Sequence, residues 1–299
     1  MMSKIKIMTD SASDISYENE KKYSISVIPF PIILRNKSYT SRVDFNNEQF
    51  FELMSQYDEI PKTSQITPYQ FQEIYLREAQ EGVTDLILVL INSQGSSTYN
   101  NSIQAIDLFY EEYPSYKETF HVYSFDGMGY NAIYGAPVVY AAQMLEKGSS
   151  LDEILQYLTD ILPRRQIYFG IYDLTYAAKS GCIPTAAAFV GTKLQLKPIM
   201  KIFNRSITTA AKFWGESKLI DRIVKMTIND IEPNTPYEVV YGNDLHSMEE
   251  LQNAMIQQLG YEPASIYQIG AAVAANAGPK VVGVSFTRKR SLIKSLNSF

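Results

Sequence analysis

The sequence contains very few of the residues that form most metal and redox sites. Its 299 residues include one cysteine, Cys182, and two histidines, His121 and His246. A single cysteine excludes an internal disulfide and any CxxC metal site, and two histidines leave little material for a histidine-rich zinc site. We therefore expect no metal and no cofactor.

Long apolar segments and a surplus of positive charge are also missing. The longest apolar runs, such as residues 86–91, are far shorter than the roughly 18 residues that a membrane span needs. The basic N-terminus lacks the apolar core of a signal peptide. Because Lys and Arg number 27 against 32 Asp and Glu, the net charge is −5, and we expect no nucleic-acid partner. These features predict a cytoplasmic protein.

The first half of the chain alternates strand-like and helix-like patterns. The expected strands are 5–8, 86–91 and 120–124, and the expected helices are 47–57, 68–81, 97–112 and 128–147. Such alternation is typical of βαβ units and predicts an α/β/α domain whose mostly parallel sheet is covered on both faces.

The second half predicts an α+β domain with a partly antiparallel sheet. Strands 198–203 and 206–213 flank Asn204-Arg205, a tight hairpin turn, and must run antiparallel. The remaining elements are helices 151–162, 217–229 and 248–259 and strands 167–171, 237–242, 265–269 and 281–286. We place the boundary near Pro163, which gives domains 1–163 and 164–287 and a basic tail, 288–299, whose Arg288, Lys289 and Arg290 we expect to be solvated.

Three polar segments, 9–14, 62–65 and 92–98, lie around the expected strand ends. In an open parallel sheet, ligands bind outside the carboxyl ends of the strands. The third segment precedes a helix, whose free N–H groups and dipole, with the hydroxyls of Ser96, Ser97 and Thr98, can hold an anion without a cationic side chain. The alternative is that Ser96 or Ser97 simply caps the helix. Both interpretations hold if one serine caps and the other faces the ligand.

The other two segments have plainer interpretations. Thr63 and Ser64 precede Pro68, and taken alone they are interpreted as capping residues of the next helix. Asp10 and Asp14 suggest a metal site, but no third carboxylate lies at a useful spacing. We therefore expect a loop held by Asx and Ser hydrogen bonds.

Motifs for nucleotide binding and for hydrolysis are missing. There is no GxGxxG after the first strand and no GxxxxGK[ST]. Ser96 lies at a strand-to-helix turn, as an esterase nucleophile would, but Gln94 and Thr98 replace the glycines of GxSxG. We interpret His246 as part of a helix start, His121 as a structural residue in a buried strand, and Cys182 as a plain small side chain.

Together these segments resemble the DegV family of bacterial fatty-acid-binding proteins. The matching segments are 8–14, 61–65, 91–99 (INSQGSSTY), 179–181, 190–194, 196–199 and 275–283. Their order and spacing cover about residues 5 to 286. The family fold, an α/β domain followed by an α+β domain, agrees with the division made above.

The resemblance implies a long-chain fatty acid, such as palmitate, buried between the domains. Its carboxylate would be held by Thr63 and Ser96, with Ser64, Ser97 and Asn276 as further ligand-binding residues. The resemblance also implies a non-catalytic role in lipid transport, or in presenting the acid to an ATP-dependent fatty acid kinase. Two alternatives remain open: a serine hydrolase that uses Ser96, and a kinase-coupled subunit that carries a non-lipid ligand.

Two departures from the family pattern remove positive charge near the expected head group. Asn276 stands where family members that work with the kinase often have His, and Cys182 stands where Arg is common. These changes matter less than the tail, because burying about fourteen methylenes is worth roughly 11 kcal/mol. A charge-assisted hydrogen bond adds about 1.5–3 kcal/mol. We therefore expect the tail to dominate affinity and the head-group contacts to fix orientation.

Overall fold

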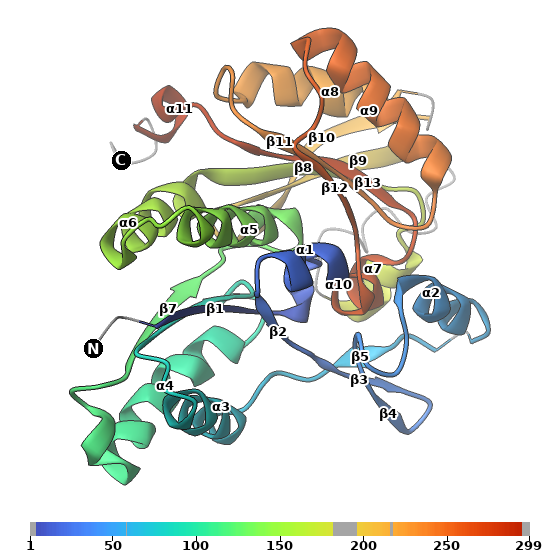
Figure 1. Cartoon of the computed structure of the whole chain (residues 1–299). Coiled ribbons are helices and arrows are strands. Elements are labelled where there is room, and N and C mark those ends of the chain that lie inside the picture. The colour runs from blue at the N-terminus through green and yellow to red at the C-terminus, as the bar shows by residue number, and fades with distance from the viewer. Residues whose placement is uncertain (1–3, 58, 182–195, 216–217, 295–299) are drawn as a thin grey trace.

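The computed structural model describes residues 4–57, 59–181, 196–215 and 218–294. Its main elements stack in five layers, in which helices and two β-sheets alternate (Figure 1). None of the helices in these ranges is long and apolar enough to cross a membrane.

The first sheet has four parallel strands in the order β2-β1-β6-β7. The strands are β1 (Ile5–Asp10), β2 (Ser26–Ile28), β6 (Asp85–Leu90) and β7 (His121–Asp126). All six residues of β6 are buried, as its unbroken apolar run predicts. β7 is an edge strand whose residues are mostly only partly buried, and the His121 side chain is 48% exposed, so the expectation of a buried strand was wrong.

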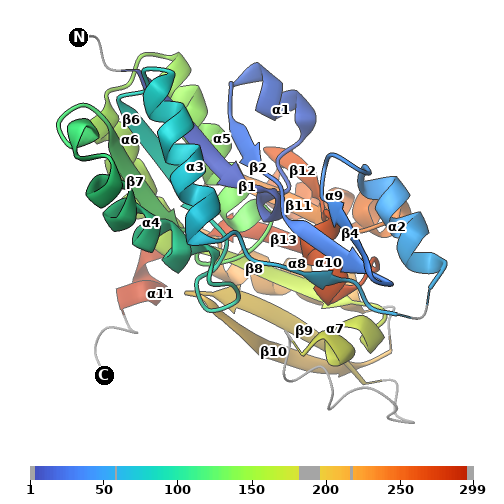
Figure 2. The same cartoon turned by 90° about the horizontal axis from the view of Figure 1, so that it is seen from below.

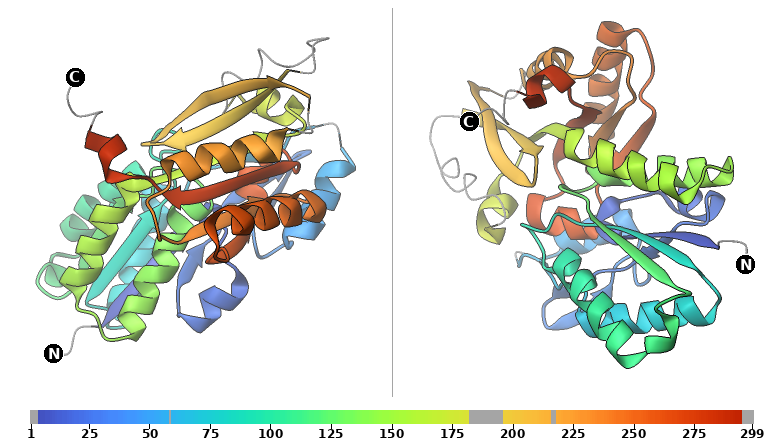
Figure 3. Two further views of the ribbon diagram at one scale, coloured as in Figure 1. Left: turned by 90° about the horizontal axis from the view of Figure 1, so that it is seen from above. Right: turned by 90° about the vertical axis from the view of Figure 1, so that its left-hand side faces the viewer.

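Helices cover both faces of this parallel sheet, which confirms the predicted α/β/α arrangement (Figure 3). One face carries α3 (Pro68–Gln80) and α4 (Thr98–Glu112), and the other carries α5 (Ala132–Glu146) and α6 (Leu151–Ile161). Helix α5 begins later than residue 128, because Met128 and Asn131 both have φ of 54° and Asn131 caps the helix through Ala132 N. Short 3-10 turns occur at η1 (Ser11–Ser13), η2 (Pro114–Tyr116) and η3 (Leu162–Arg164).

The second sheet has six strands in the order β10-β9-β8-β13-β11-β12, and all neighbours are antiparallel except β11 and β12. The strands are β8 (Arg165–Ile171), β9 (Leu196–Phe203), β10 (Ser206–Trp214), β11 (Tyr237–Tyr241), β12 (Ser265–Gln268) and β13 (Val281–Thr287). Asn204 and Arg205 have φ of 46° and 70°, which confirms the tight hairpin turn between β9 and β10.

Helices α8 (Leu219–Asp230) and α9 (Leu245–Leu259) cover the outer face of the second sheet, and α5 lies on its inner side (Figure 1). A buried ion pair fastens α5 to this sheet. The Arg165 guanidinium contacts Glu238 and donates hydrogen bonds to Ser285 Oγ at 2.6 Å and to the Ala132 carbonyl oxygen at 3.3 Å. This pair therefore fixes the start of α5 against the second domain.

A small antiparallel sheet and a helix at 17–22 in the first half of the chain were not predicted, whereas the helix predicted at 47–57 is present. The strands are β3 (Pro31–Leu34), β4 (Lys37–Thr40) and β5 (Lys62–Thr63), in the order β4-β3-β5. Helix α1 (Tyr17–Lys22) precedes β2, and α2 (Asn47–Ser55) follows β4. Phe50 of α2 and Ile32 of β3 belong to the same hydrophobic core as Phe169 of β8. Figure 2 shows α2 and β4 on the side of the molecule opposite α4.

The C-terminal part also contains three short helices, α7 (Thr175–Ser180), α10 (Ala271–Ala277) and α11 (Arg290–Lys294). The sequence indicates α7 through Gly181, a helix stop with φ of 73°, whereas α10 and α11 were not predicted. The composition of residues 276–279, Asn-Ala-Gly-Pro, predicts a turn, but the chain is helical as far as Ala277 and the turn begins only at Gly278, where φ is 80°. Arg288, expected to be solvated, lies 4.6 Å from the Phe203 ring centroid, and its side chain is 14% exposed. The cation–π contact explains why this part of the tail packs on the sheet.

Candidate functional site

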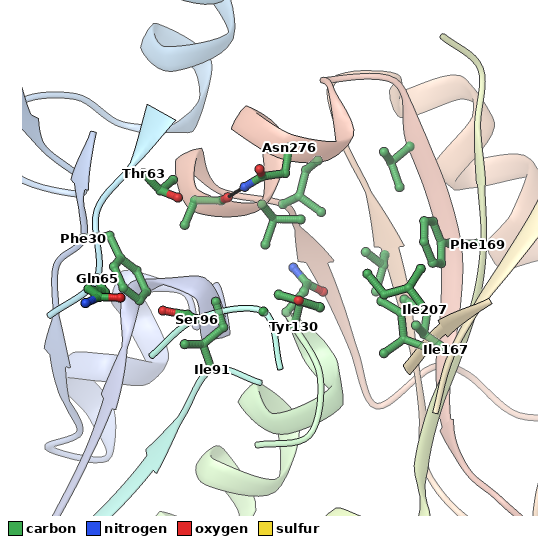
Figure 4. Close-up of a pocket in the computed structure, with 18 of the residues that line it drawn as sticks. Phe30, Thr63, Gln65, Ile91, Ser96, Tyr130, Ile167, Phe169, Ile207 and Asn276 are labelled. Carbon is green, nitrogen blue, oxygen red and sulfur yellow. Dashed lines mark hydrogen bonds between the residues drawn. The ribbon is translucent and has the colours of Figure 1, made fainter. Parts of the chain in front are cut away.

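A cavity of about 210 Å³ lies between the two domains, at the carboxyl end of β6. Its polar lining consists of Thr63, Ser64, Gln65, Ser96, Tyr130, Asn131 and Asn276. Its other lining residues are Phe30, Ile91, Gly95, Ile167, Phe169, Ile202, Ile207, Val240, Ile269, Ala272, Val273 and Val281. Figure 4 shows Thr63, Gln65 and Ser96 on one side of the cavity and Phe169, Ile167 and Ile207 on the opposite side. The cavity therefore has a polar end and an apolar end.

Ser96 both faces the cavity and supports the start of α4. Its N–H donates to the Asn92 carbonyl oxygen at 3.0 Å, and its Oγ accepts from Thr98 N at 3.3 Å. Ser96 is thus both a cavity-lining residue and a hydrogen-bond partner of the first turn of α4. Ser97, at the N-cap position, is exposed, is not among the lining residues, and its side chain makes no capping hydrogen bond in the described structure.

Thr63 and Ser64 reach the cavity because the chain from 62 to 64 is held against β3. Thr63 pairs with Ile32, and Ser64 N donates to the Pro31 carbonyl oxygen at 3.1 Å. The capping interpretation of these two residues was wrong, because Thr67 caps α3 in a capping box with Gln70. Both are cavity-lining residues instead.

Asn276 lies on α10 rather than in a turn, and its side chain also lines the cavity (Figure 4). Its Nδ2 donates to the Ala272 carbonyl oxygen at 3.0 Å, and its own carbonyl oxygen accepts from Ser180 Oγ at 3.2 Å. The amide oxygen of an Asn side chain accepts hydrogen bonds and its NH₂ donates them, so Asn276 can interact with either a donor or an acceptor group of a ligand.

No charged side chain is among the residues that line this cavity in the described ranges. An anionic head group here would meet hydroxyls, side-chain amides and backbone N–H groups only. Of two apolar residues near the cavity, Phe30 lines it, and Ile171 lies in the adjoining core instead. Phe189 and Cys182 lie outside the described residues, as does the matching segment 190–194.

A polar network connects the Ser96 loop to the hairpin of the second domain. The Asp126 carboxylate accepts from Ser93 Oγ at 2.5 Å, from Met128 N at 2.8 Å and from Arg205 Nε at 2.6 Å. Asn92 Nδ2 donates to the Arg205 carbonyl oxygen at 2.8 Å. Sequence reasoning missed this network, because Arg205 is far from the other residues along the chain and no local pattern marks it.

The segment 9–14 comprises the end of β1 and the η1 turn, and it is held by side-chain hydrogen bonds, as expected. Asp10 accepts from Ile91 N and from Tyr134 Oη, both at 2.6 Å, and from Ala12 N at 3.0 Å. Burial raises the pKa of Asp10 to about 6, although these hydrogen bonds oppose the shift. No group of three or more metal-ligating side chains occurs in the part of the chain that the structure describes. Asp10 thereby fixes the residue from which the Ser96 loop starts.

Neither histidine belongs to the cavity. His246 follows Asp244, which caps α9 by accepting from His246 N at 3.1 Å, in agreement with the predicted helix start. His121 is on the edge strand β7. Among the described residues, Ser96 therefore has no histidine beside it in the cavity lining to act as a general base.

The fold and the cavity define a two-domain α/β protein that encloses an amphipathic pocket. A family model described as "Uncharacterised protein, DegV family" matches residues 4–289. The chain therefore belongs to the DegV family.

Relatives cover nearly the whole chain. A DegV domain-containing protein from Clostridium perfringens is 29% identical over 96% of this chain and 100% of its own length. A solved structure of a DegV family protein from Thermus thermophilus is described as showing fatty acid binding. That protein is 25% identical to this chain, with a TM-score of 0.82, and the match covers 95% of this chain and 99% of that one. A stearic-acid-binding protein from Eubacterium ventriosum shares the fold, with a TM-score of 0.84 and 22% identity over 97% and 100% of the two chains.

Proposed function

We propose that this protein binds a long-chain fatty acid in the cavity between its two domains and acts as a carrier, not as an enzyme. The observation that carries the proposal is the division of the cavity into a hydroxyl-lined end and an apolar end. A free fatty acid has the same two parts. The fatty acids named for the related proteins of Thermus thermophilus and Eubacterium ventriosum support this choice of ligand.

The carboxylate would lie between Thr63 and Ser96, with Ser64 and Asn276 beside it. These side chains line the same cavity, and Thr63, at the end of β5, and Ser96, in the loop after β6, lie at one end of it (Figure 4). Neutral hydroxyls are adequate partners, because their O–H groups can donate charge-assisted hydrogen bonds to the carboxylate. We assign no contact to Ser97, which is exposed.

The bound acid would be presented to a partner protein, an ATP-dependent fatty acid kinase that phosphorylates the carboxyl group. The absence of a histidine from the described cavity lining favours this division of labour over hydrolysis by the chain itself. A reconstituted assay with a bacterial fatty acid kinase and ATP tests it: we expect acyl phosphate to form when this protein carries oleate. ATP turnover that does not respond to the loaded protein would contradict the partnership.

Native mass spectrometry of the purified protein tests the binding itself. We expect a co-purified acyl ligand, or uptake of added palmitate or oleate at one molecule per chain. The double variant Thr63→Ala, Ser96→Ala should bind at least tenfold more weakly, since each hydrogen bond to a charged group is worth about 1.5–3 kcal/mol. Ser97→Ala is the matched control and should bind like the wild type. Equal affinity of all three proteins would remove the head-group assignment.

The serine hydrolase alternative makes a separate prediction. A nucleophilic Ser96 would react with a fluorophosphonate probe, whereas we expect no labelling because the described cavity lining contains no histidine. Labelling of the wild type that is lost in Ser96→Ala would favour the hydrolase.

A further inference from the structure

Part of the apolar wall of the cavity is a row of three isoleucines on neighbouring strands of the second sheet. Ile202 of β9 pairs with Ile167 of β8 on one side and with Ile207 of β10 on the other. Directly paired residues project to the same face of a sheet, and all three line the cavity, as Figure 4 shows for Ile167 and Ile207. A single residue separates Ile202 and Ile207 from the Asn204-Arg205 turn. The position of this turn therefore governs the position of the isoleucine row.

Asn92 organises the loop that carries Ser96 at the polar end of the cavity. Asn92 is buried, and its carbonyl oxygen accepts from Gly95 N and from Ser96 N, both at 3.0 Å. Its side-chain Oδ1 accepts from Gln94 N at 3.1 Å. Its Nδ2 donates to the Arg205 carbonyl oxygen at 2.8 Å. A single residue thus connects the backbone of Ser96 to the turn beside the isoleucine row.

Arg205 is held against the first domain through both its backbone and its side chain. Its N–H donates to the Met128 carbonyl oxygen at 3.1 Å, and its Nε donates to the buried Asp126 carboxylate at 2.6 Å. Asp126 also accepts from Met128 N at 2.8 Å and from Ser93 Oγ at 2.5 Å. The carboxylate therefore joins the turn both to the loop after β7 and to the loop that carries Ser96.

The backbone conformation of Arg205 indicates that its side chain does more than complete a turn. Its φ is 70°, in the left-handed region where the second position of a two-residue hairpin turn favours glycine. Met128, which bonds to it across the domain boundary, has φ of 54°. Non-glycine residues persist in such conformations where surrounding contacts hold them, and they cluster at ligand clamps. The hydrogen bonds of Arg205 and Met128 to Asp126 are contacts of this kind.

We propose that Asn92 and Arg205 are positioning residues that fix the distance between Ser96 and the isoleucine row, and that this distance sets the fatty-acid chain length the protein prefers. The proposal rests on the fatty-acid site proposed above. With the carboxyl group held at Ser96, the acyl chain reaches a wall whose place is fixed by hydrogen bonds. A packed wall that cannot move rejects additional methylenes, whereas a wall that yields accepts them. Loosening the turn therefore reduces the difference in affinity between the preferred acid and longer ones.

Two glycine substitutions in the same turn separate this role from turn formation. Arg205→Gly removes the side chain that binds Asp126 and leaves a residue that adopts positive φ readily, so the turn itself is kept. Asn204→Gly is the matched control. Asn204 has φ of 46°, and its side-chain oxygen accepts from Arg205 Nη1 at 3.3 Å, within the turn.

Chain-length preference is measured by displacement of the fluorescent cis-parinaric acid with saturated acids from C12 to C22. The readout is the affinity for the acid two carbons longer than the preferred one, relative to the preferred acid. Arg205→Gly should raise this ratio by roughly fivefold or more, since one methylene in a fixed hydrophobic pocket changes affinity by roughly 10–200-fold. Asn204→Gly should keep the wild-type ratio. A general loss of stability weakens the binding of all acids by one factor, so an unchanged ratio in Arg205→Gly, or an equal change in Asn204→Gly, would overturn the proposal.

Hydrogen exchange in the ligand-free protein, followed by NMR, tests the connection itself. The amides of Gly95 and Ser96, which donate to the Asn92 carbonyl oxygen, should exchange roughly fivefold faster or more in Arg205→Gly than in the wild type. The amides of α9 report any loss of global stability, and the effect is taken relative to them. Unchanged relative exchange of Gly95 and Ser96 would overturn the proposal. If the wild type binds no fatty acid, the proposed function fails, and this comparison still decides whether Arg205 holds the loop that carries Ser96.

Discussion

The apolar end of the cavity makes the most quantitative prediction. Ile207 of β10 lines the cavity and pairs across the sheet with Ile202, a second lining residue. Replacing Ile207 with Trp fills space that the end of the acyl tail would occupy. Each displaced methylene forfeits about 0.8 kcal/mol, roughly a fourfold loss of affinity. If three methylenes are displaced, the loss is about 2.4 kcal/mol, or roughly sixtyfold.

The expected signature is a change in chain-length preference. In native mass spectrometry with equimolar C12, C14, C16 and C18 acids, Ile207→Trp should lose C18 most strongly and keep C12 near its wild-type level. Thr208→Trp is the matched control, because Thr208 is the next residue on the same strand, is exposed, and points to the opposite face. A wild-type distribution in Ile207→Trp, or an equal shift in Thr208→Trp, would refute the placement of the tail.

Three further perturbations follow from the same contacts. Gly95→Ala places a Cβ 1.9 Å from Tyr130 Oη, so the tyrosine ring must move. We expect severalfold weaker fatty-acid binding by titration calorimetry. Unchanged binding would contradict the role of Gly95 and Tyr130 as a wall of the cavity. Asp126→Ala leaves Arg205 without its carboxylate and should lower the free energy of unfolding by about 2 kcal/mol in urea, whereas no loss would show that the network is dispensable. Folding raises the pKa of Asp14 from 3.8 to about 8. The contribution of this group to the free energy of unfolding is therefore full below pH 3.8 and is lost as the pH rises through about 8. Asp14→Asn should flatten the decline in the free energy of unfolding between pH 5 and pH 9.

The parts of the fold that were predictable have strong local signals. The unbroken apolar run of β6 predicts a strand buried on both faces, and Asn204-Arg205 between two apolar runs predicts a hairpin because Asn tolerates positive φ. The small sheet has no such signal. β5 is only two residues long, and β4 is polar and largely exposed, so their pairing depends on β3 rather than on their own sequence.

Helix α10 was missed for a different reason. Its sequence, AAVAANA, has no clear apolar period, and the following Gly278-Pro279 is typical of a turn. Five of its seven residues are buried, so packing between the domains stabilises a helix that the periodicity does not indicate.

The candidate site was predictable where short motifs carry it. Thr63, Ser96 and Asn276 were named from polar segments and the family resemblance, and all three line one cavity. The Asp126–Arg205 ion pair was not predictable, because it joins the end of β7 to the β9–β10 turn of the other domain and no local sequence pattern marks either residue.

Photo-crosslinking with two diazirine fatty acids tests the central claim most directly, since it locates both ends of the ligand in the same protein. A diazirine next to the carboxyl group should label the polar end, at or beside Thr63, Ser96 and Asn276. A diazirine at the terminal carbon should label the apolar end, on β8, β9 or β10. Labelling of both ends at one place, or on the surface away from the cavity, would contradict the account.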